Sequence, residues 1–304
     1  MVHRLIRVLS IVVLLGGGIV LSTSPQVAAQ QAPASAKPSA ATAAPTPSPT
    51  PVKIPPAEKA NAAGKNVTAE AVVEWVIAIY GGGIGRPVLD QVRRNGNEQG
   101  EIVKISADGR TETANYSWRF IRGASGDKDK IRVDQKSPTL EYALVFNAGQ
   151  TFGIMNGAAF VPRQEATDSF LNQQRRGLDA LLRYKENESS ITLLNREKQK
   201  GLDLYVVEVT DKEKRHTRYY ISSRTLRVLW LEYEEPGAAG TPVNFVKKFS
   251  DYRYAQNTLI PKHTELFEDG KQTQEMTIKT ITYGVRMDDA LFQHPDNQTS
   301  SRTP

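Results

Sequence analysis

Hydrophobic residues recur along the chain with two different periods, and the first period is helical. From Thr68 to Tyr80 the apolar residues stand three or four positions apart, which predicts an amphipathic helix with Thr68 as its N-cap. Four glycines follow between Gly81 and Gly85. A phosphate-binding loop comes after a strand and opens a helix, whereas this run closes a helix and leads to Pro87. We therefore interpret the glycines as a helix stop, with Gly81 in the left-handed conformation.

After this helix the period shortens to two, which is typical of strands. In TANYSWRF and TLEYALVF every second residue is large and apolar, and turn sequences such as ADG and NAGQ separate the segments. The pattern predicts a mainly β fold with about 11 antiparallel strands. A sheet of this size is expected to curl into an incomplete barrel. Periodicity leaves open whether its concave face is a filled core or a cavity.

The helical period returns once, between Gln164 and Lys185. Apolar residues recur there along one side, and Gly177 breaks the stretch into two parts. Because this segment interrupts a series of strands, we expect a helical insert that covers the curled sheet as a lid. A lid has to release its apolar face when a ligand enters, whereas an ordinary core helix stays packed.

The N-terminal part of the chain differs in composition from the rest. Arg4 and Arg7 precede a short apolar run and a small-residue cleavage pattern, which predicts a signal peptide over residues 1–29. A retained anchor is the alternative, but a span needs about 20 apolar residues. Residues 30–64 are rich in Ala, Pro, Ser and Thr and are expected to form a disordered linker.

The remaining chain is long enough for one domain, expected over residues 65–296, with a disordered tail at 297–304. The absence of cysteine from an exported chain favours the bacterial periplasm. The formal net charge is +6, but the basic residues are spread along the chain rather than gathered in a stripe with aromatic residues. We therefore expect no nucleic-acid partner. The protein is expected to be a monomer.

Few residue patterns indicate catalysis. His216, His263 and His294 stand alone, and no spacing is typical of a metal site or of a nucleophile elbow. The adjacent carboxylates Glu234–Glu235 and Asp288–Asp289 stand beside turns, and the second pair is expected to cap the short terminal turn DDALF. The sequence therefore predicts neither an enzyme, nor a metal site, nor a cofactor.

Aromatic and aliphatic residues are the remaining candidates for a site, because they could line a lipid cavity; the alternative is that they form an ordinary core. The candidates are Trp75, Trp118, Phe120, Phe146, Phe152, Phe160, Phe170, Leu178, Leu181 and Trp230.

The order of these segments resembles a known family. The segments are DKIRVDQ after a hairpin, YYISSRTLRVLWLEYE as strand, turn and strand, and FSDYRYAQNTLIPKHTELFEDGK leading to ITYGVRMDDALFQHP. This order is similar to that of the outer-membrane lipoprotein-sorting proteins (LolA-like), over about residues 68–295.

The resemblance implies a half-barrel under lid helices, enclosing an apolar cavity for the acyl chains of lipids or lipoproteins. It also implies a carrier without catalysis, which could meet inner- or outer-membrane proteins. In the sorting proteins an arginine near the second and third strands holds the lid closed, and Arg122 occupies the corresponding region. A regulatory or sensor module on the same fold, as in sigma-factor regulators, is the alternative function.

Overall fold

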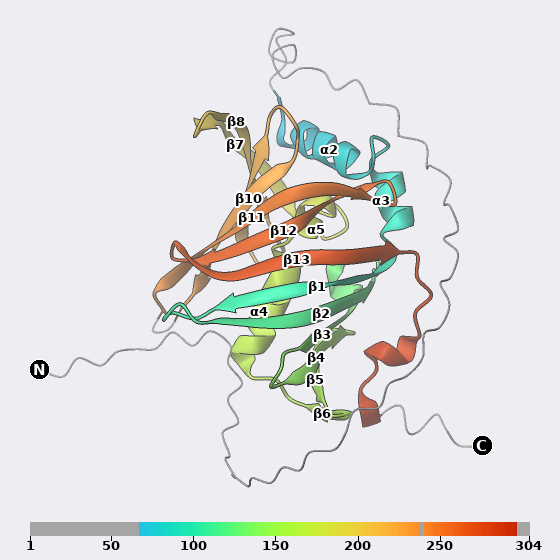
Figure 1. The fold of residues 1–304 in the computed structure, drawn as a ribbon. Coiled ribbons are helices and arrows are strands. Elements are labelled where there is room, and N and C mark those ends of the chain that lie inside the picture. The colour runs from blue at the N-terminus through green and yellow to red at the C-terminus, as the bar shows by residue number, and fades with distance from the viewer. Residues whose placement is uncertain (1–66, 238–239, 297–304) are drawn as a thin grey trace, which may run out of the picture.

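A computed structural model describes residues 67–237 and 240–296 of the chain (Figure 1). The predicted signal peptide at 1–29, the linker at 30–64 and the tail at 297–304 lie outside the described residues.

One antiparallel sheet contains thirteen strands in the described part of the chain, two more than the approximate number predicted. Two meanders, β1 to β6 and β7 to β13, are joined by the pairing of β1 with β13, and the order is β6-β5-β4-β3-β2-β1-β13-β12-β11-β10-β9-β8-β7. The strands are β1 (Asn95–Ile105), β2 (Thr111–Ile121), β3 (Lys130–Lys136), β4 (Glu141–Asn147), β5 (Gln150–Met155), β6 (Ala158–Phe160), β7 (Ser190–Gln199), β8 (Leu202–Thr210), β9 (His216–Ser222), β10 (Val228–Pro236), β11 (Pro242–Ala255), β12 (Thr258–Glu268) and β13 (Lys271–Tyr283). Because β6 and β7 remain edges, the sheet is a curled, incomplete barrel, which confirms the predicted fold class.

The first described helix, α2 (Ala69–Tyr80), begins where the sequence predicts. The Thr68 hydroxyl accepts a hydrogen bond from the Ala71 amide at 3.2 Å. The helix ends at the glycine run, but Gly81 has a φ of −91° and Gly82 is the first left-handed residue, with a φ of +64°. The prediction for Gly81 was therefore wrong by one residue.

A second helix, α3 (Arg86–Val92), follows the glycines and was not predicted. Pro87 stands in its first turn, where the missing amide hydrogen has no helical partner in any case. The proline thus begins a new helix instead of only preventing continuation of the old one.

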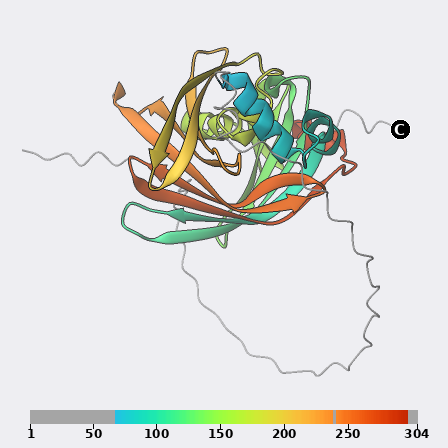
Figure 2. The same cartoon turned by 90° about the horizontal axis from the view of Figure 1, so that it is seen from above.

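The insert between the two meanders is helical, as predicted, and forms α4 (Gln164–Arg175) and α5 (Leu178–Leu182). Gly177 lies between them as the N-cap of α5. Seen from above, the strands curl around α5, and α2 lies across this end of the barrel (Figure 2). None of the helices in the described ranges has the length and apolar character needed to cross a bilayer.

Two separate apolar cores fill the concave side. The larger core joins α2 and α5 to β8–β12, with Val76, Leu181, Tyr205, Tyr219 and Leu231 among its buried members. The smaller core joins α4 to the other half of the sheet, and its buried members are Phe120, Ile131, Phe146, Phe170, Ile260 and Tyr283. The insert therefore contributes to both cores.

The C-terminal segment packs on the convex side of β3 and β4 as a short 3-10 helix, η3 (Asp289–Phe292). Its Phe292 is fully buried, and the Phe292 carbonyl accepts a hydrogen bond from Asn147 at 3.1 Å. The Asp288 side chain caps the helix by accepting from the Ala290 amide, as the sequence predicts.

Two glycines in β1 make room for aromatic rings on the concave face. A Cβ atom on Gly96 would lie 2.8 Å from the Phe120 ring, and one on Gly100 would lie 2.7 Å from the Tyr116 ring. These glycines interrupt the alternating pattern, so β1 is hard to recognise in the sequence.

We expect Gly100→Ala to lower the free energy of unfolding by about 1–3 kcal/mol, the usual cost of overpacking. The added Cβ would lie 2.2 Å from the Thr277 carbonyl oxygen, so the β1–β13 backbone has to move. Urea denaturation measures the change. Gly109→Ala, at a turn where a Cβ meets nothing within 4 Å, is the comparison for added bulk, although its φ of +81° adds strain. A Gly100→Ala variant as stable as the wild type would contradict the register.

Candidate ligand-binding site

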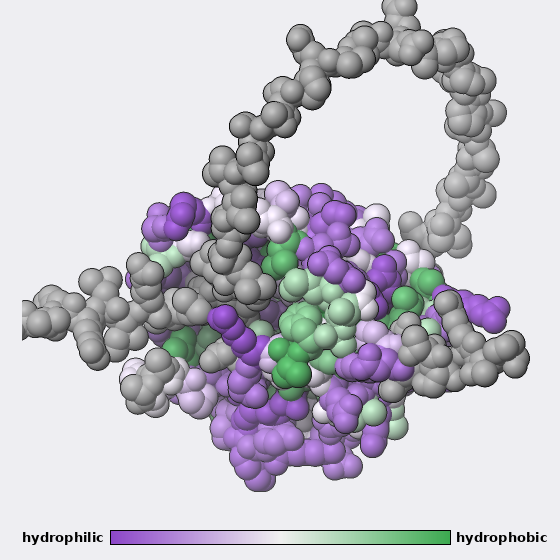
Figure 3. Space-filling view, turned by 90° about the horizontal axis from the view of Figure 1, so that it is seen from below, coloured by the Kyte–Doolittle hydropathy of each residue, from purple (hydrophilic) through white to green (hydrophobic). Residues whose placement is uncertain are grey.

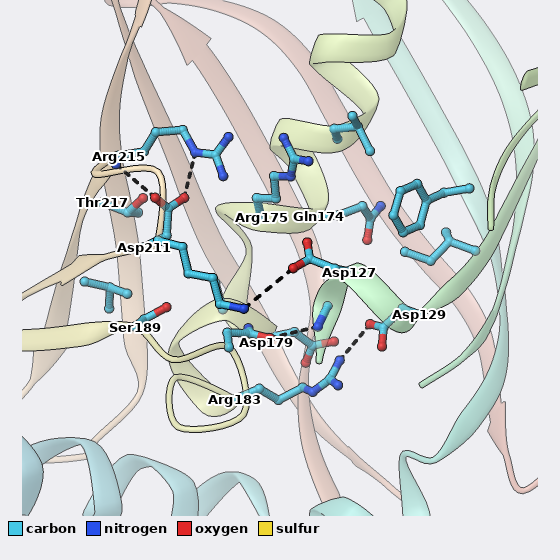
Figure 4. Close-up of a pocket in the computed structure, with 18 of the residues that line it drawn as sticks. Asp127, Asp129, Gln174, Arg175, Asp179, Arg183, Ser189, Asp211, Arg215 and Thr217 are labelled. Carbon is cyan, nitrogen blue, oxygen red and sulfur yellow. Dashed lines mark hydrogen bonds and ion pairs between the residues drawn. The ribbon is translucent and has the colours of Figure 1, made fainter. Parts of the chain in front are cut away.

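A cavity of about 100 Å³ lies where the insert meets the concave face of β2–β4 and the end of the β8–β9 hairpin (Figure 4). We call it the seam pocket. Its apolar wall consists of Trp118, Phe120, Ile131, Phe146, Leu171 and Val209. Charged side chains from the insert and from the loops at 122–129 and 211–215 complete the lining.

Asp179, in the first turn of α5, connects the insert to two arginines, one before β1 and one at the end of β2. Arg122 at the end of β2 donates to Asp179 at 2.5 Å, and Arg93 after α3 lies 3.6 Å from the other carboxylate oxygen. Burial alone would raise the pKa of Asp179, but the Arg122 and Arg93 guanidinium groups outweigh it and hold this pKa below its ordinary value. Arg122 was the residue suggested as a lid latch by the family resemblance, and it does contact the insert.

A second pair anchors the C-terminal end of α5. Arg183 donates to the Asp129 carboxylate at 2.7 Å and to the Gly123 carbonyl at 3.0 Å. Asp129 also accepts from the Gly123 amide at 2.8 Å. Both side chains of this pair are almost fully buried, so the insert is fixed to the loop after β2 by charge-assisted hydrogen bonds.

A third pair anchors the junction between α4 and α5 on the opposite side of the barrel. Arg176 contacts Glu235 of β10 at 2.6 Å and lies over the Tyr233 ring at 4.7 Å. The Tyr219 hydroxyl donates to the Gly177 carbonyl at 2.9 Å. The insert is thus held by ion pairs at three places, and the pairs of Asp179 and Arg183 border the seam pocket.

Glu98 is a buried carboxyl on the concave face of β1. The Tyr116 hydroxyl donates to it at 2.7 Å. Burial is the main cause that raises the pKa of Glu98 to about 7; the hydrogen bond from Tyr116 and the charge of Arg93 oppose this rise, and the nearby Asp179 adds to it. A group with such a pKa changes charge near neutral pH.

The structure brings three of the ten candidate residues into the seam pocket, namely Trp118, Phe120 and Phe146. Phe170 lies next to them in the smaller core. The indole nitrogen of Trp118 is buried and has no hydrogen-bond partner among the described residues. An unpartnered donor in a cavity can bind an oxygen atom of a ligand.

The other candidates lie elsewhere. Leu181 is buried in the larger core, and Trp75 and Leu178 pack against that core. Phe160 lies over Gly153 at the β6 edge.

Two aromatic candidates lie on the convex side. Phe152 contacts the His294 ring, with 5.1 Å between the ring centroids. Trp230 stacks on Tyr220, while its chain neighbour Leu231 faces the core.

Sequence reasoning missed the charged members of the site. Asp179 and Arg183 stand four positions apart, a spacing that is usual for an exposed pair on a helix surface. Nothing in the sequence indicates that each of them has a separate partner across the fold. In the described ranges, no group of three or more His, Asp or Glu side chains is placed to hold a metal ion.

Comparison with known proteins identifies the fold but not a sequence family. No protein-family model matches the chain, and no curated protein matches it. A LolA superfamily protein from Nitrosomonas europaea superposes with a TM-score of 0.52 at 13% identity, covering 75% of this chain and 98% of that one. A DUF1329 family protein from Desulfovibrio piger gives a TM-score of 0.51 at 14% identity, with coverages of 75% and 98%. The chain therefore has the LolA-like fold that the sequence predicted.

Proposed function

We propose that the protein is a periplasmic binding protein that carries acyl chains of lipids or lipoproteins beneath the insert α4–α5, without catalysis. The observation that carries this proposal is the attachment of the insert. The insert is buried in the two apolar cores through Phe170 and Leu181. Between these residues it borders the apolar wall of the seam pocket, where ion pairs join it to the surrounding loops.

The size of the pocket supports a moving insert. Pockets for small molecules usually measure about 300–1,000 Å³, whereas the seam pocket measures about 100 Å³. An acyl chain therefore requires the insert to shift away from β2–β4. Each buried CH₂ group then stabilises the complex by about 0.8 kcal/mol.

One face of the molecule has an apolar region (Figure 3). In the view from below, apolar side chains gather in the middle of the face, between hydrophilic borders (Figure 3). Val161, in the connection between β6 and α4, is 92% exposed. Such a region suits a protein that meets lipid or a partner that delivers lipid.

Native mass spectrometry of protein purified from the periplasm tests the proposal. We expect bound acyl species in the wild type, and saturable binding of cis-parinaric acid, a fluorescent fatty acid, after delipidation. If neither is observed, the carrier function is wrong, and a regulatory module that binds protein becomes the better explanation.

The ion pairs of Asp179 with Arg122 and Arg93 allow a sharper test of the same function. We expect Asp179→Asn to release the bound probe about tenfold faster, because charge-assisted bonds to Arg122 and Arg93 are lost. Stopped-flow displacement measures the release rate. The matched control is Asp127→Asn, because Asp127 lines the same pocket and its ion-pair partner among the described residues, Lys212, lies 3.8 Å away. Equal rates for both variants would show that the insert does not limit release.

A further inference from the structure

One face of helix α4 lines the seam pocket. Leu171, Gln174 and Arg175 all belong to the lining, and residues three or four positions apart lie side by side on a helix surface. Leu171 packs against the smaller core, whereas the two polar residues are labelled in Figure 4 at the end of α4. The pocket face of α4 therefore changes within one turn from apolar to polar.

The other charges around the pocket are paired. Each carboxylate of the lining has a basic partner; the carboxylates are those of Asp127, Asp129, Asp179, Asp211 and Glu213. Their partners within the lining are Arg122, Arg183, Lys212 and Arg215. Arg215 holds two of the carboxylates, each at 2.6 Å. No carboxylate of the lining is therefore left to neutralise a further cation.

Arg175 is the further cation of the lining. Its side chain forms neither an ion pair nor a hydrogen bond with any residue of the described ranges, and it is half-buried. A basic residue in the last turn suits the dipole of α4, but the dipole supplies no hydrogen-bond acceptor at the guanidinium group. A guanidinium group that is partly removed from water without an acceptor is costly, and an anion in the pocket would remove this cost.

Two more polar groups of the lining lack a partner. The Gln174 side chain has no hydrogen bond to the described part of the chain. On the sheet side, the buried indole nitrogen of Trp118 is also unpartnered. Indole and guanidinium groups can donate hydrogen bonds but cannot accept them. A ligand that satisfies this pocket therefore has to bring acceptor oxygen atoms.

The seam pocket has room for a compact head group without any movement of the insert. A cavity needs about 10–15 Å³ to hold one water molecule, and this one measures about 100 Å³. Its apolar wall, which includes Phe120, Ile131 and Phe146, borders the same space. Polar and apolar parts of an amphiphilic ligand can thus each meet a matching surface in one cavity.

From this arrangement we infer that the seam pocket selects an anionic head group, a carboxylate or a phosphate, whose oxygen atoms accept hydrogen bonds from Arg175 and Gln174 while the acyl chain follows the apolar wall. The inference rests on the proposed acyl-binding function. It adds the charge of the ligand and the residues of α4 that recognise it. Neutral acyl esters lack the charge that Arg175 would bind.

The test compares cis-parinaric acid with its methyl ester, which has the same chain without the charge. We expect the wild type to bind the acid about tenfold more tightly, as one hydrogen-bonded charge pair provides. Arg175→Gln should remove this preference and leave ester binding unchanged, whereas Arg175→Lys should keep most of it. Fluorescence titration with each probe gives the two dissociation constants.

Arg163→Gln is the matched control. It removes a positive charge from the N-cap of the same helix, outside the lining of the seam pocket, and should keep the preference of the wild type. A second measurement needs no variant. The preference of the wild type for the acid should fall as the salt concentration rises, because the half-buried charge of Arg175 is screened. A preference that does not change with salt would contradict the role of Arg175.

Competition distinguishes the two head groups. Palmitate and lysophosphatidate are each compared with a neutral monoacylglycerol as displacers of the bound acid, and the stronger anionic displacer identifies carboxylate or phosphate. Equal affinity of the wild type for acid and ester, or a preference that survives in Arg175→Gln, would overturn the inference and leave the carrier function intact. No saturable binding of either probe would instead refute the carrier function itself.

Discussion

Leu181→Ala is expected to lower the free energy of unfolding by about 2–5 kcal/mol, the usual range for a fully buried leucine. Leu181 has no exposed surface and belongs to the same core as Val76 of α2. Truncation therefore leaves a cavity between the insert and the rest of the domain. Denaturation in urea, followed by circular dichroism, measures the loss.

The control for this prediction is Leu171→Ala. Leu171 belongs to α4 and is only half-buried, because it faces the seam pocket. We expect a loss of about 1 kcal/mol or less, since little buried surface is removed. If both variants lose the same free energy of unfolding, the insert is packed as tightly at the seam pocket as in the larger core. The prediction that the insert can move away from β2–β4 would then be wrong.

Leu181 and Leu171 show why the sequence predicted a helical insert but not which of its residues lie in a core and which face the seam pocket. Helical periodicity marked Leu181 and Leu171 alike as apolar positions. Periodicity gives the face of a helix on which a residue lies, but not what packs against that face. Here Leu181 meets α2, which lies about 100 residues earlier in the chain.

The curled sheet and the glycine stop could be predicted, because they depend on local alternation and on local backbone preferences. The contacts that the arginines of the site make could not be predicted. The site combines three separate segments of the chain, which contribute Arg93, Arg122 and Asp179. Only the packing of the insert against β1 and β2 brings these side chains together.

The second large effect is a loss of stability as the pH rises. The ordinary pKa of Glu98 is 4.5 and its pKa in the folded protein is about 7. Between these values the folded state keeps a proton that the unfolded state has released. The stabilisation is therefore complete below about pH 4.5 and is lost by about pH 7, and it amounts to roughly 3 kcal/mol.

Glu98→Gln should remove this pH dependence, because the amide oxygen can still accept from Tyr116 and no longer titrates. Urea denaturation of wild type and variant at pH 5 and pH 8 measures how much the free energy of unfolding of each protein changes with pH. Glu101→Gln is the matched control on the opposite face of β1, where Glu101 pairs with Lys279 at 3.0 Å. A Glu98→Gln variant with the pH dependence of the wild type would show that Glu98 does not titrate in this window.

The pairing of β1 with β13 has a consequence for how the chain folds. Every other strand pair in the sheet is formed by consecutive strands, which can meet soon after they are synthesised. The β1–β13 pair joins Gly96 to Tyr283 and has to close almost the whole domain into one loop. Loop-closure entropy makes such long-range pairing slow. The two meanders are therefore expected to form first as separate arms, and the barrel interior comes into being only when β13 docks on β1.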